Sequence, residues 1–145
     1  GGVQPTSLTA DKDLLYVLNA GGSGNISGFN IEQDGSLSPL AGSTQPVSNG
    51  GVGAAPGLAQ IAFSSDGSTL VVTEKTTSLI DTYQVEEGLA GAPVTHASSG
   101  AVPFGFAFDS HGHAIVSEAS GAGTLQARSR DPVLLHASSD RGPHP

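Results

Sequence analysis

Three segments of the sequence can be laid over one another, and this internal repeat restricts the fold more than any other feature. The segments are TSLTADKDLLYVLN from Thr6, GLAQIAFSSDGSTLVVTE from Gly57 and PFGFAFDSHGHAIVSE from Pro103. Anchoring them on Leu8, Phe63 and Phe108 gives spacings of 55 and 45 residues. Periods of ~20–50 residues are typical of chains that stack one supersecondary unit on the next. The sequence therefore predicts consecutive copies of a single unit.

The turn residues within each copy divide it into short strands. Asp66-Gly67 lies between IAFSS and STLVVTE, and this dipeptide favours a two-residue hairpin turn with both residues at positive φ. Asp11-Lys12 and His111-Gly112 stand at the matching places of the other copies. A second hairpin follows, at Asp34-Gly35 in the first copy and around residues 86–88 in the second. Each unit is thus predicted to be a four-stranded antiparallel sheet.

Four-stranded antiparallel sheets at this period pack face to face around an axis, and a closed ring takes roughly 4–8 of them. The chain is therefore predicted to be all-β, an incomplete β-propeller in one partial domain over 1–145. Its blades are expected at about 3–43, 57–99 and 101–139. Uncovered blade edges invite pairing, so we expect a fragment of a longer protein or self-association through the open edges. The predicted core comprises Leu15, Val17, Phe29, Ile61, Phe63, Val71, Tyr83, Phe106, Phe108 and Ile115.

The last residues, 128–145, leave two alternatives open. Three of the five basic residues fall in this stretch and its end lacks alternation, which favours an atypical, frameshifted or foreign tail. The segment PVLLHASS at 132–139 echoes PVTHASS at 93–99, which instead favours the fourth strand of the third blade.

Composition restricts the partners. The formal net charge is −8, from 13 acidic and 5 basic residues, and no Lys/Arg cluster offers a surface for phosphates, so we expect no nucleic-acid partner. Apolar runs such as residues 70–72 are far shorter than the ~20 residues of a membrane span, so no membrane partner is expected either. With no Cys, disulfides and thiolate metal sites are excluded. The first ten residues lack the features of a signal peptide, and the compartment is left open, with export to the periplasm or the medium as one alternative.

Two stretches carry a family resemblance. YVLNAGGSGNISGFNIEQDGSLSPL and FSSDGSTLVVTEKTTSLIDTYQV resemble blades of the seven-bladed lactonase-type propellers, a family that includes 6-phosphogluconolactonases and carboxymuconate-lactonising enzymes. The resemblance covers about residues 3–125. It implies a lactone or sugar-like small-molecule ligand and no cofactor.

In active members of that family a blade of this kind reads roughly PRH-x-x-F…NE. The resemblance implies that its Arg and His begin the innermost strand and that its Glu ends the next strand. In the second unit Ala59 and Gln60 stand where the resemblance implies Arg and His, and Glu74 stands at the position of the acid. The third unit has Phe104-Gly105 with Glu118, and the first has Gln4-Pro5 with Asn19.

The hairpin centred on Asp66-Gly67 would put Glu74 opposite Ala59, so both would lie at one mouth of a central channel. We therefore predict Glu74 and Glu118 as catalytic carboxylates and Gln60 and Asn19 as ligand-binding residues. One hypothesis is hydrolysis of a sugar lactone by these acids. The alternative is a non-enzymatic propeller that serves as a scaffold or binding protein, because lactonase chemistry without the guanidinium loses its main anion-stabilising group.

His111 and His113 flank Gly112 in a predicted turn, with Asp109 beside them. An i, i+2 His pair can hold a metal ion if a third ligand approaches, but this spacing alone is a weak signal. From the sequence we interpret these as exposed turn residues and predict no metal site.

Overall fold

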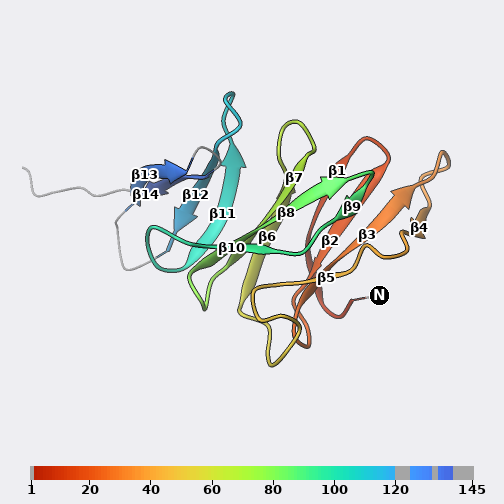
Figure 1. The fold of residues 1–145 in the computed structure, drawn as a ribbon, viewed down its shortest axis with the longest axis horizontal. Coiled ribbons are helices and arrows are strands. Elements are labelled where there is room, and N and C mark those ends of the chain that lie inside the picture. The colour runs from red at the N-terminus through yellow and green to blue at the C-terminus, as the bar shows by residue number, and fades with distance from the viewer. Residues whose placement is uncertain (1, 120–124, 132–133, 139–145) are drawn as a thin grey trace, which may run out of the picture.

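The computed structural model describes residues 2–119, 125–131 and 134–138. They form three β-sheets that stand side by side, in chain order (Figure 1). The first sheet contains β1 (Pro5–Asp11), β2 (Leu14–Asn19), β3 (Asn25–Ile31), β4 (Leu37–Pro39) and β5 (Gln45–Pro46). The second contains β6 (Leu58–Phe63), β7 (Thr69–Glu74), β8 (Leu79–Glu86), β9 (Leu89–Ala90) and β10 (Val94–Ala97). The third contains β11 (Pro103–Phe108), β12 (Ala114–Glu118), β13 (Leu125–Asp131) and β14 (Leu134–Ser138).

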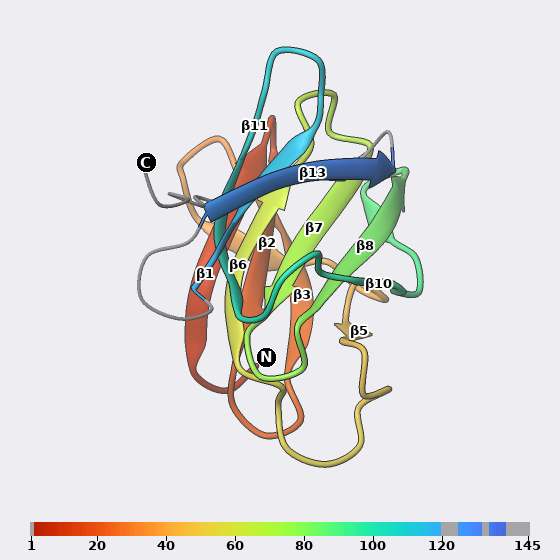
Figure 2. The same cartoon turned by 90° about the vertical axis from the view of Figure 1, so that its left-hand side faces the viewer.

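The first two sheets repeat one plan. In the first sheet the order of neighbours is β1, β2, β3 and β4, and in the second it is β6, β7, β8 and β10. The short strands β5 and β9 pair with β3 and β8, and all pairs in both sheets are antiparallel. The first strands of the three sheets, β1, β6 and β11, follow one another along one side of the stack (Figure 2). This arrangement confirms the predicted all-β fold built from blade-like sheets. Among the residues that the structure describes, no helix has the length and hydropathy to cross a membrane.

The third sheet departs from the expected antiparallel order. Its order is β11-β12-β14-β13, and β14 runs parallel to β12. The segment expected to be the outermost strand therefore lies next to β12, and β13 takes the outer place.

The first hairpin of the second sheet is wider than predicted. β6 ends at Phe63 and β7 begins at Thr69, so the loop covers five residues, 64–68. Within this loop only Gly67 has positive φ, +73°. The carboxylate of Asp66 accepts hydrogen bonds from the backbone N–H of Ser68 and from the Ser64 and Ser68 hydroxyls. These bonds hold the longer loop, so the two-residue turn predicted from Asp-Gly is wrong here. The loop at 109–113 in the third sheet has the same length and the same glycine position, Gly112.

The core lies between the sheets. One cluster joins the first and second sheets, and its largest members include Tyr16, Leu18, Ile26, Leu70 and Tyr83. A smaller cluster joins the second and third sheets through Val71, Ile80, Ala114 and Val116. Strand β7 is buried over its whole length, because it lies in the middle sheet and is covered on both faces.

The predicted core holds for the middle sheet and fails for residues on the outer faces. Ile61, Phe63, Val71 and Tyr83 are buried as predicted. Leu15, Val17 and Phe29 are only half-buried, and Tyr16 and Leu18 are buried in their place. Ile115 is 37% exposed, while its neighbours Ala114 and Val116 are buried. The reason is that side chains of a strand alternate between faces, and no described sheet covers the outer face of the first or third sheet. Phe106 and Phe108 are half-buried against the smaller cluster.

Candidate functional site

The three predicted strand-end residues occupy equivalent places. Asn19, Glu74 and Glu118 are the last residues of β2, β7 and β12, and their cross-strand partners are Pro5, Leu58 and Pro103. In each hairpin the register shifts just after that partner, which is the mark of a β-bulge. The bulge moves Glu74 opposite Leu58, so the predicted pairing of Glu74 with Ala59 is off by one residue.

A residue in the left-handed backbone conformation comes directly before each of the inner strands β1, β6 and β11. Gln4, Gly57 and Val102 have φ of +55°, +69° and +58°. Their carbonyls accept hydrogen bonds of 2.8–2.9 Å from the N–H of the residue after each strand-end position. Non-glycine residues rarely adopt this conformation, and a β-branched residue such as Val102 is a genuine outlier. The same left-handed corner thus recurs in all three sheets, next to the candidate site residues, and is strained where it falls on Gln4 and Val102.

Glu74 is fully buried, at 0% exposure, and its carboxylate is held by the connection between the first and second sheets. Oε1 accepts a hydrogen bond from the backbone N–H of Ser48 at 3.0 Å, and Oε2 accepts one from the Ser48 hydroxyl at 2.7 Å and one from the Thr77 hydroxyl at 2.5 Å. Three donors therefore converge on one carboxylate. This arrangement satisfies a buried negative charge and fastens residue 48 to the end of β7.

A second buried carboxylate, Asp81 of β8, lies beside Glu74 and was not among the predicted site residues. Asp81 is also 0% exposed and accepts hydrogen bonds from the Ser48 N–H at 3.0 Å and the Thr95 hydroxyl at 2.9 Å. Burial, reinforced by the hydrogen bond and the negative charge of Glu74, raises the pKa of Asp81 to about 7. A carboxyl group with a pKa of about 7 is partly protonated at neutral pH. The available sequence signal was an Asp in the apolar strand SLIDTYQV.

Glu118 repeats the role of Glu74 one sheet further along. It is buried, and its Oε1 accepts hydrogen bonds from the backbone N–H of Gly100 at 2.8 Å and from the Ser98 hydroxyl at 2.5 Å. Residues 98 and 100 belong to the connection between the second and third sheets. In the first sheet Asn19 is buried and donates from Nδ2 to the Asn25 side chain at 2.9 Å and to the Ser27 hydroxyl at 3.5 Å. Its partners lie within its own sheet.

Gln60 joins the second sheet to the third. Its Nε2 donates to the carbonyl of Phe106 at 3.0 Å, and its Oε1 accepts from the N–H of the same residue at 2.9 Å. The side-chain amide thus pairs with the backbone of β11 as a neighbouring strand would. Ser7 and Thr9 of β1 accept hydrogen bonds from the N–H groups of Ile61 and Phe63 in the same manner. The innermost strands have no backbone partner on this side, so these side chains take that place.

In the third unit Phe104 stands where the family resemblance implies an Arg. The ammonium group of Lys75, from the second sheet, contacts its ring. The ammonium nitrogen of Lys75 lies 4.9 Å from the centroid of the Phe104 ring, within the range of a cation–π contact. Lys75 follows Glu74 directly. A positive charge is therefore present over the ring of Phe104, although the sequence carries no Arg at this point.

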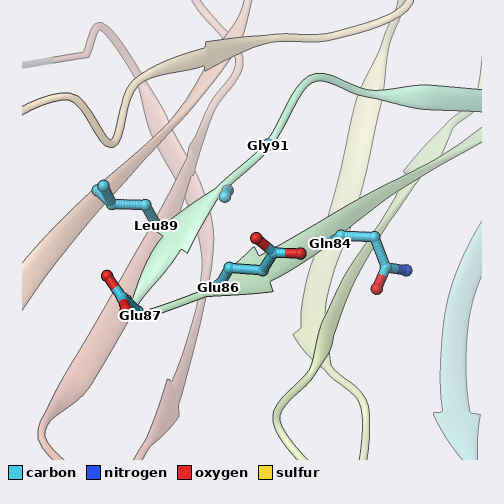
Figure 3. Close-up of a pocket in the computed structure, with 6 residues that line it drawn as sticks. Gln84, Glu86, Glu87, Leu89 and Gly91 are labelled. Atoms are coloured by element: carbon cyan, nitrogen blue, oxygen red, sulfur yellow. The ribbon is translucent and has the colours of Figure 1, made fainter.

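A pocket lies away from these residues, at the outer hairpin of the second sheet (Figure 3). It measures about 560 Å³ and is lined by Gln84, Glu86, Glu87, Leu89, Ala90 and Gly91. The Glu86 side chain extends from the last residue of β8, and that of Glu87 from the turn between β8 and β9. Tyr16 of the first sheet fixes this turn, because its hydroxyl donates to the carbonyl of Gly88 at 2.8 Å and accepts from the N–H of Ala90 at 2.9 Å. The predicted site residues do not line this pocket.

These features define a class of protein: consecutive four-stranded blades, each with a bulged inner strand and a buried polar residue at the end of the second strand. The family model described as lactonase, 7-bladed beta-propeller matches residues 43–137. The chain therefore belongs to the lactonase family of seven-bladed β-propellers.

A solved structure agrees in fold. The crystal structure of "a putative 6-phosphogluconolactonase" from Bacteroides fragilis matches with a TM-score of 0.56 and 18% sequence identity. The match covers 74% of this chain and 32% of that one, so the part compared spans about a third of the length of that protein. At this identity the likeness shows the fold alone. No curated protein matches the chain.

Proposed function

We propose that this chain contributes consecutive blades to a lactonase-type propeller that acts as a binding scaffold. In this proposal Glu74 and Glu118 fasten the connections between blades and do not hydrolyse lactones. The observation that carries the proposal is the shared bonding of the two acids. Each is buried, and each accepts hydrogen bonds from a backbone N–H and a Ser hydroxyl of the connection that leads into its own sheet.

Accessibility also supports the scaffold proposal. An acid or base that transfers a proton must come within hydrogen-bond reach of the reacting group. Glu74 and Asp81 have no exposed surface, so a substrate could reach them only if residue 48 and its neighbours moved away. Gln60 has both ends of its amide engaged with Phe106, which accounts for this residue without a ligand.

Replacement of Glu74 by Ala tests the proposal. The hydroxyls of Ser48 and Thr77 would lose their acceptor, while the Ser48 N–H would keep Asp81, and each buried group left unpaired costs about 1–3 kcal/mol. The matched control is Glu86→Ala, which removes an exposed carboxylate from the next strand of the same sheet and is expected to change stability by less than about 0.5 kcal/mol. Thermal unfolding measures both variants. The scaffold proposal fails if Glu74→Gln abolishes a lactone hydrolysis that the wild-type protein performs while its unfolding temperature stays the same.

Lactone hydrolysis remains the second candidate function, and two observations favour it. The pKa of Asp81, raised to about 7, suits a residue that donates and accepts protons at neutral pH. Lys75 beside Phe104 offers a positive charge where the family resemblance places Arg. This candidate predicts that the protein hydrolyses 6-phosphogluconolactone or a simple lactone and that Lys75→Ala removes the activity. No hydrolysis by the wild-type protein on these substrates would exclude it.

Self-association through uncovered blade surfaces is part of the scaffold proposal. Leu8 on the first sheet is 63% exposed and Ile115 on the third is 37% exposed, and a further sheet packed on either face would bury apolar side chains of this kind. Sedimentation velocity over a range of protein concentrations tests this. A monomer at every concentration would contradict it.

A further inference from the structure

We propose that the turn between β11 and β12 binds a divalent transition-metal ion through Asp109, His111 and His113. One ligand atom from each of the three side chains can be chosen so that all lie within 4.8 Å of one another. Two imidazoles and one carboxylate form a ligand set suited to Zn²⁺, Ni²⁺ or Cu²⁺ and poorly suited to Mg²⁺ or Ca²⁺, which take mostly oxygen ligands. The site lies at the opposite end of the strands from Glu74 and Glu118.

The ligand atoms are already close to the spacing that a metal ion requires. Nδ1 of His113 lies 2.8 Å from Oδ2 of Asp109, and Nδ1 of His111 lies 3.9 Å from the same oxygen. Ligands about 2.0–2.1 Å from a tetrahedral zinc ion are about 3.3 Å apart, and the two observed distances bracket this value. The two rings are 6.0 Å apart between centroids, so small side-chain rotations suffice to place an ion among the three groups.

The carboxylate is oriented by the backbone of its own loop. Oδ1 of Asp109 accepts hydrogen bonds from the N–H groups of His111 and His113 at 2.8 and 2.9 Å. Oδ2 faces both imidazoles and is hydrogen-bonded to Nδ1 of His113 at 2.8 Å, and an ion bound between these two groups would replace that hydrogen bond. Hydrogen bonds of the kind that Oδ1 accepts fix the direction of a ligating group and raise metal affinity.

The convergence of these side chains follows from the shape of the loop. The corresponding loop of the second sheet has Ser64, Asp66 and Ser68 at the same three positions, and both Ser hydroxyls lie 2.7 Å from Oδ1 of Asp66. First, third and fifth loop residues thus meet in two separate sheets. Only the third sheet carries imidazoles there.

A space beside the cluster offers room for water on the ion. A pocket of about 390 Å³ lies between the two loops and is lined by Ser64, Ser65, Asp66, Ser68, Ser110, His111 and Gly112. His111 is 78% exposed, so an ion can enter from solvent. Three protein ligands with solvent access correspond to an open metal site, in which water completes the coordination. The net charge of −8 favours cation binding in general.

Calorimetric titration of the purified protein with ZnCl₂ and NiCl₂ tests the proposal. We expect saturable binding of one ion per chain. Asp109→Asn and His113→Gln should each weaken it by at least about 10-fold, the lower end of what even outer-shell partners contribute. The control His96→Gln replaces a histidine that contacts Thr82 in another part of the second sheet and should leave the affinity unchanged. Replacing His136 and His144 together should also leave it unchanged.

A loop exchange separates metal binding from folding. The triple variant Asp109→Ser, His111→Asp, His113→Ser installs the three residues that the second sheet uses in the same loop. It should unfold at a temperature close to that of the wild type and bind neither ion. The proposal is overturned if wild-type binding does not saturate, if the loop-exchanged protein binds with wild-type affinity, or if affinity follows His136 and His144.

Discussion

Replacing Asp81 by Asn should stabilise the protein at neutral and alkaline pH and have little such effect at acidic pH. The pKa of Asp81 is raised to about 7 in the folded protein, from an ordinary value of 3.8. The folded state therefore keeps a proton that the unfolded state releases. For a carboxyl with a raised pKa, stability is full below about pH 4, falls as the pH rises toward 7, and changes no further above that.

The size of the effect follows from the shift in pKa. A shift of about 3 units at about 1.4 kcal/mol per unit sets an upper limit of about 4 kcal/mol. Asn keeps the acceptor for the Thr95 hydroxyl and supplies a permanent N–H donor toward Glu74, as the protonated acid does. Asn at position 81 loses the hydrogen bond from the Ser48 N–H, but this N–H keeps its second acceptor, the carboxylate of Glu74. We therefore expect a gain of about 2–4 kcal/mol above pH 7 relative to the wild type.

Urea unfolding of wild type and Asp81→Asn at several values between pH 4 and pH 8 measures the difference. The control is Asp34→Asn, because hydrogen bonds from Ser36 lower the pKa of this exposed carboxyl, and it should show no gain with rising pH. If the difference between Asp81→Asn and wild type is the same at pH 4 and pH 8, the pKa of Asp81 is not raised in the folded protein and the reasoning is refuted.

Two further substitutions test the blade geometry. Val102→Gly should raise the unfolding temperature, because a non-glycine residue in the left-handed region costs about 1–2 kcal/mol and Val102 has φ of +58°; the same change at Val94, an exposed strand residue outside that region, should lower it. Gln60→Ala should destabilise the protein by about 1–3 kcal/mol, since it removes both partners of the Phe106 backbone, and amide exchange at Phe106 should become faster. An unchanged exchange rate at Phe106 would show that Gln60 does not hold the two sheets together.

The sequence predicts the repeated sheets well because the repeat and the turn residues act locally. The equivalence of Asn19, Glu74 and Glu118 could be predicted by aligning the repeats. The bulge that pairs Glu74 with Leu58 could not be predicted. A single sequence does not mark which strand residue is the extra one, because this depends on how the inner strand packs against its neighbour.

Residues whose environment depends on distant segments were beyond sequence reasoning. Strand β2, LLYVLN, is apolar on both faces, so its alternation cannot decide whether Tyr16 or Val17 faces the second sheet. Asp81 lies on the same face as Glu74 because β8 pairs with β7 in a register that places Asp81 opposite Val72, but their burial also depends on the connection at Ser48, which the strand pattern does not reveal. The approach of His111 and His113 to Asp109 depends on a five-residue loop, whereas the residues predicted a shorter one.

Hydrogen exchange at the Ser48 amide tests the central claim most directly, which is that buried strand-end acids fasten the connections between blades. This N–H bonds to the carboxylates of Glu74 and Asp81, at 3.0 Å each. We predict slow exchange in the wild-type protein, comparable with strand amides of the second sheet, and faster exchange in Glu74→Ala, in which Asp81 is the acceptor that remains. Exchange at Ser48 in the wild type as fast as in an exposed loop would contradict the account.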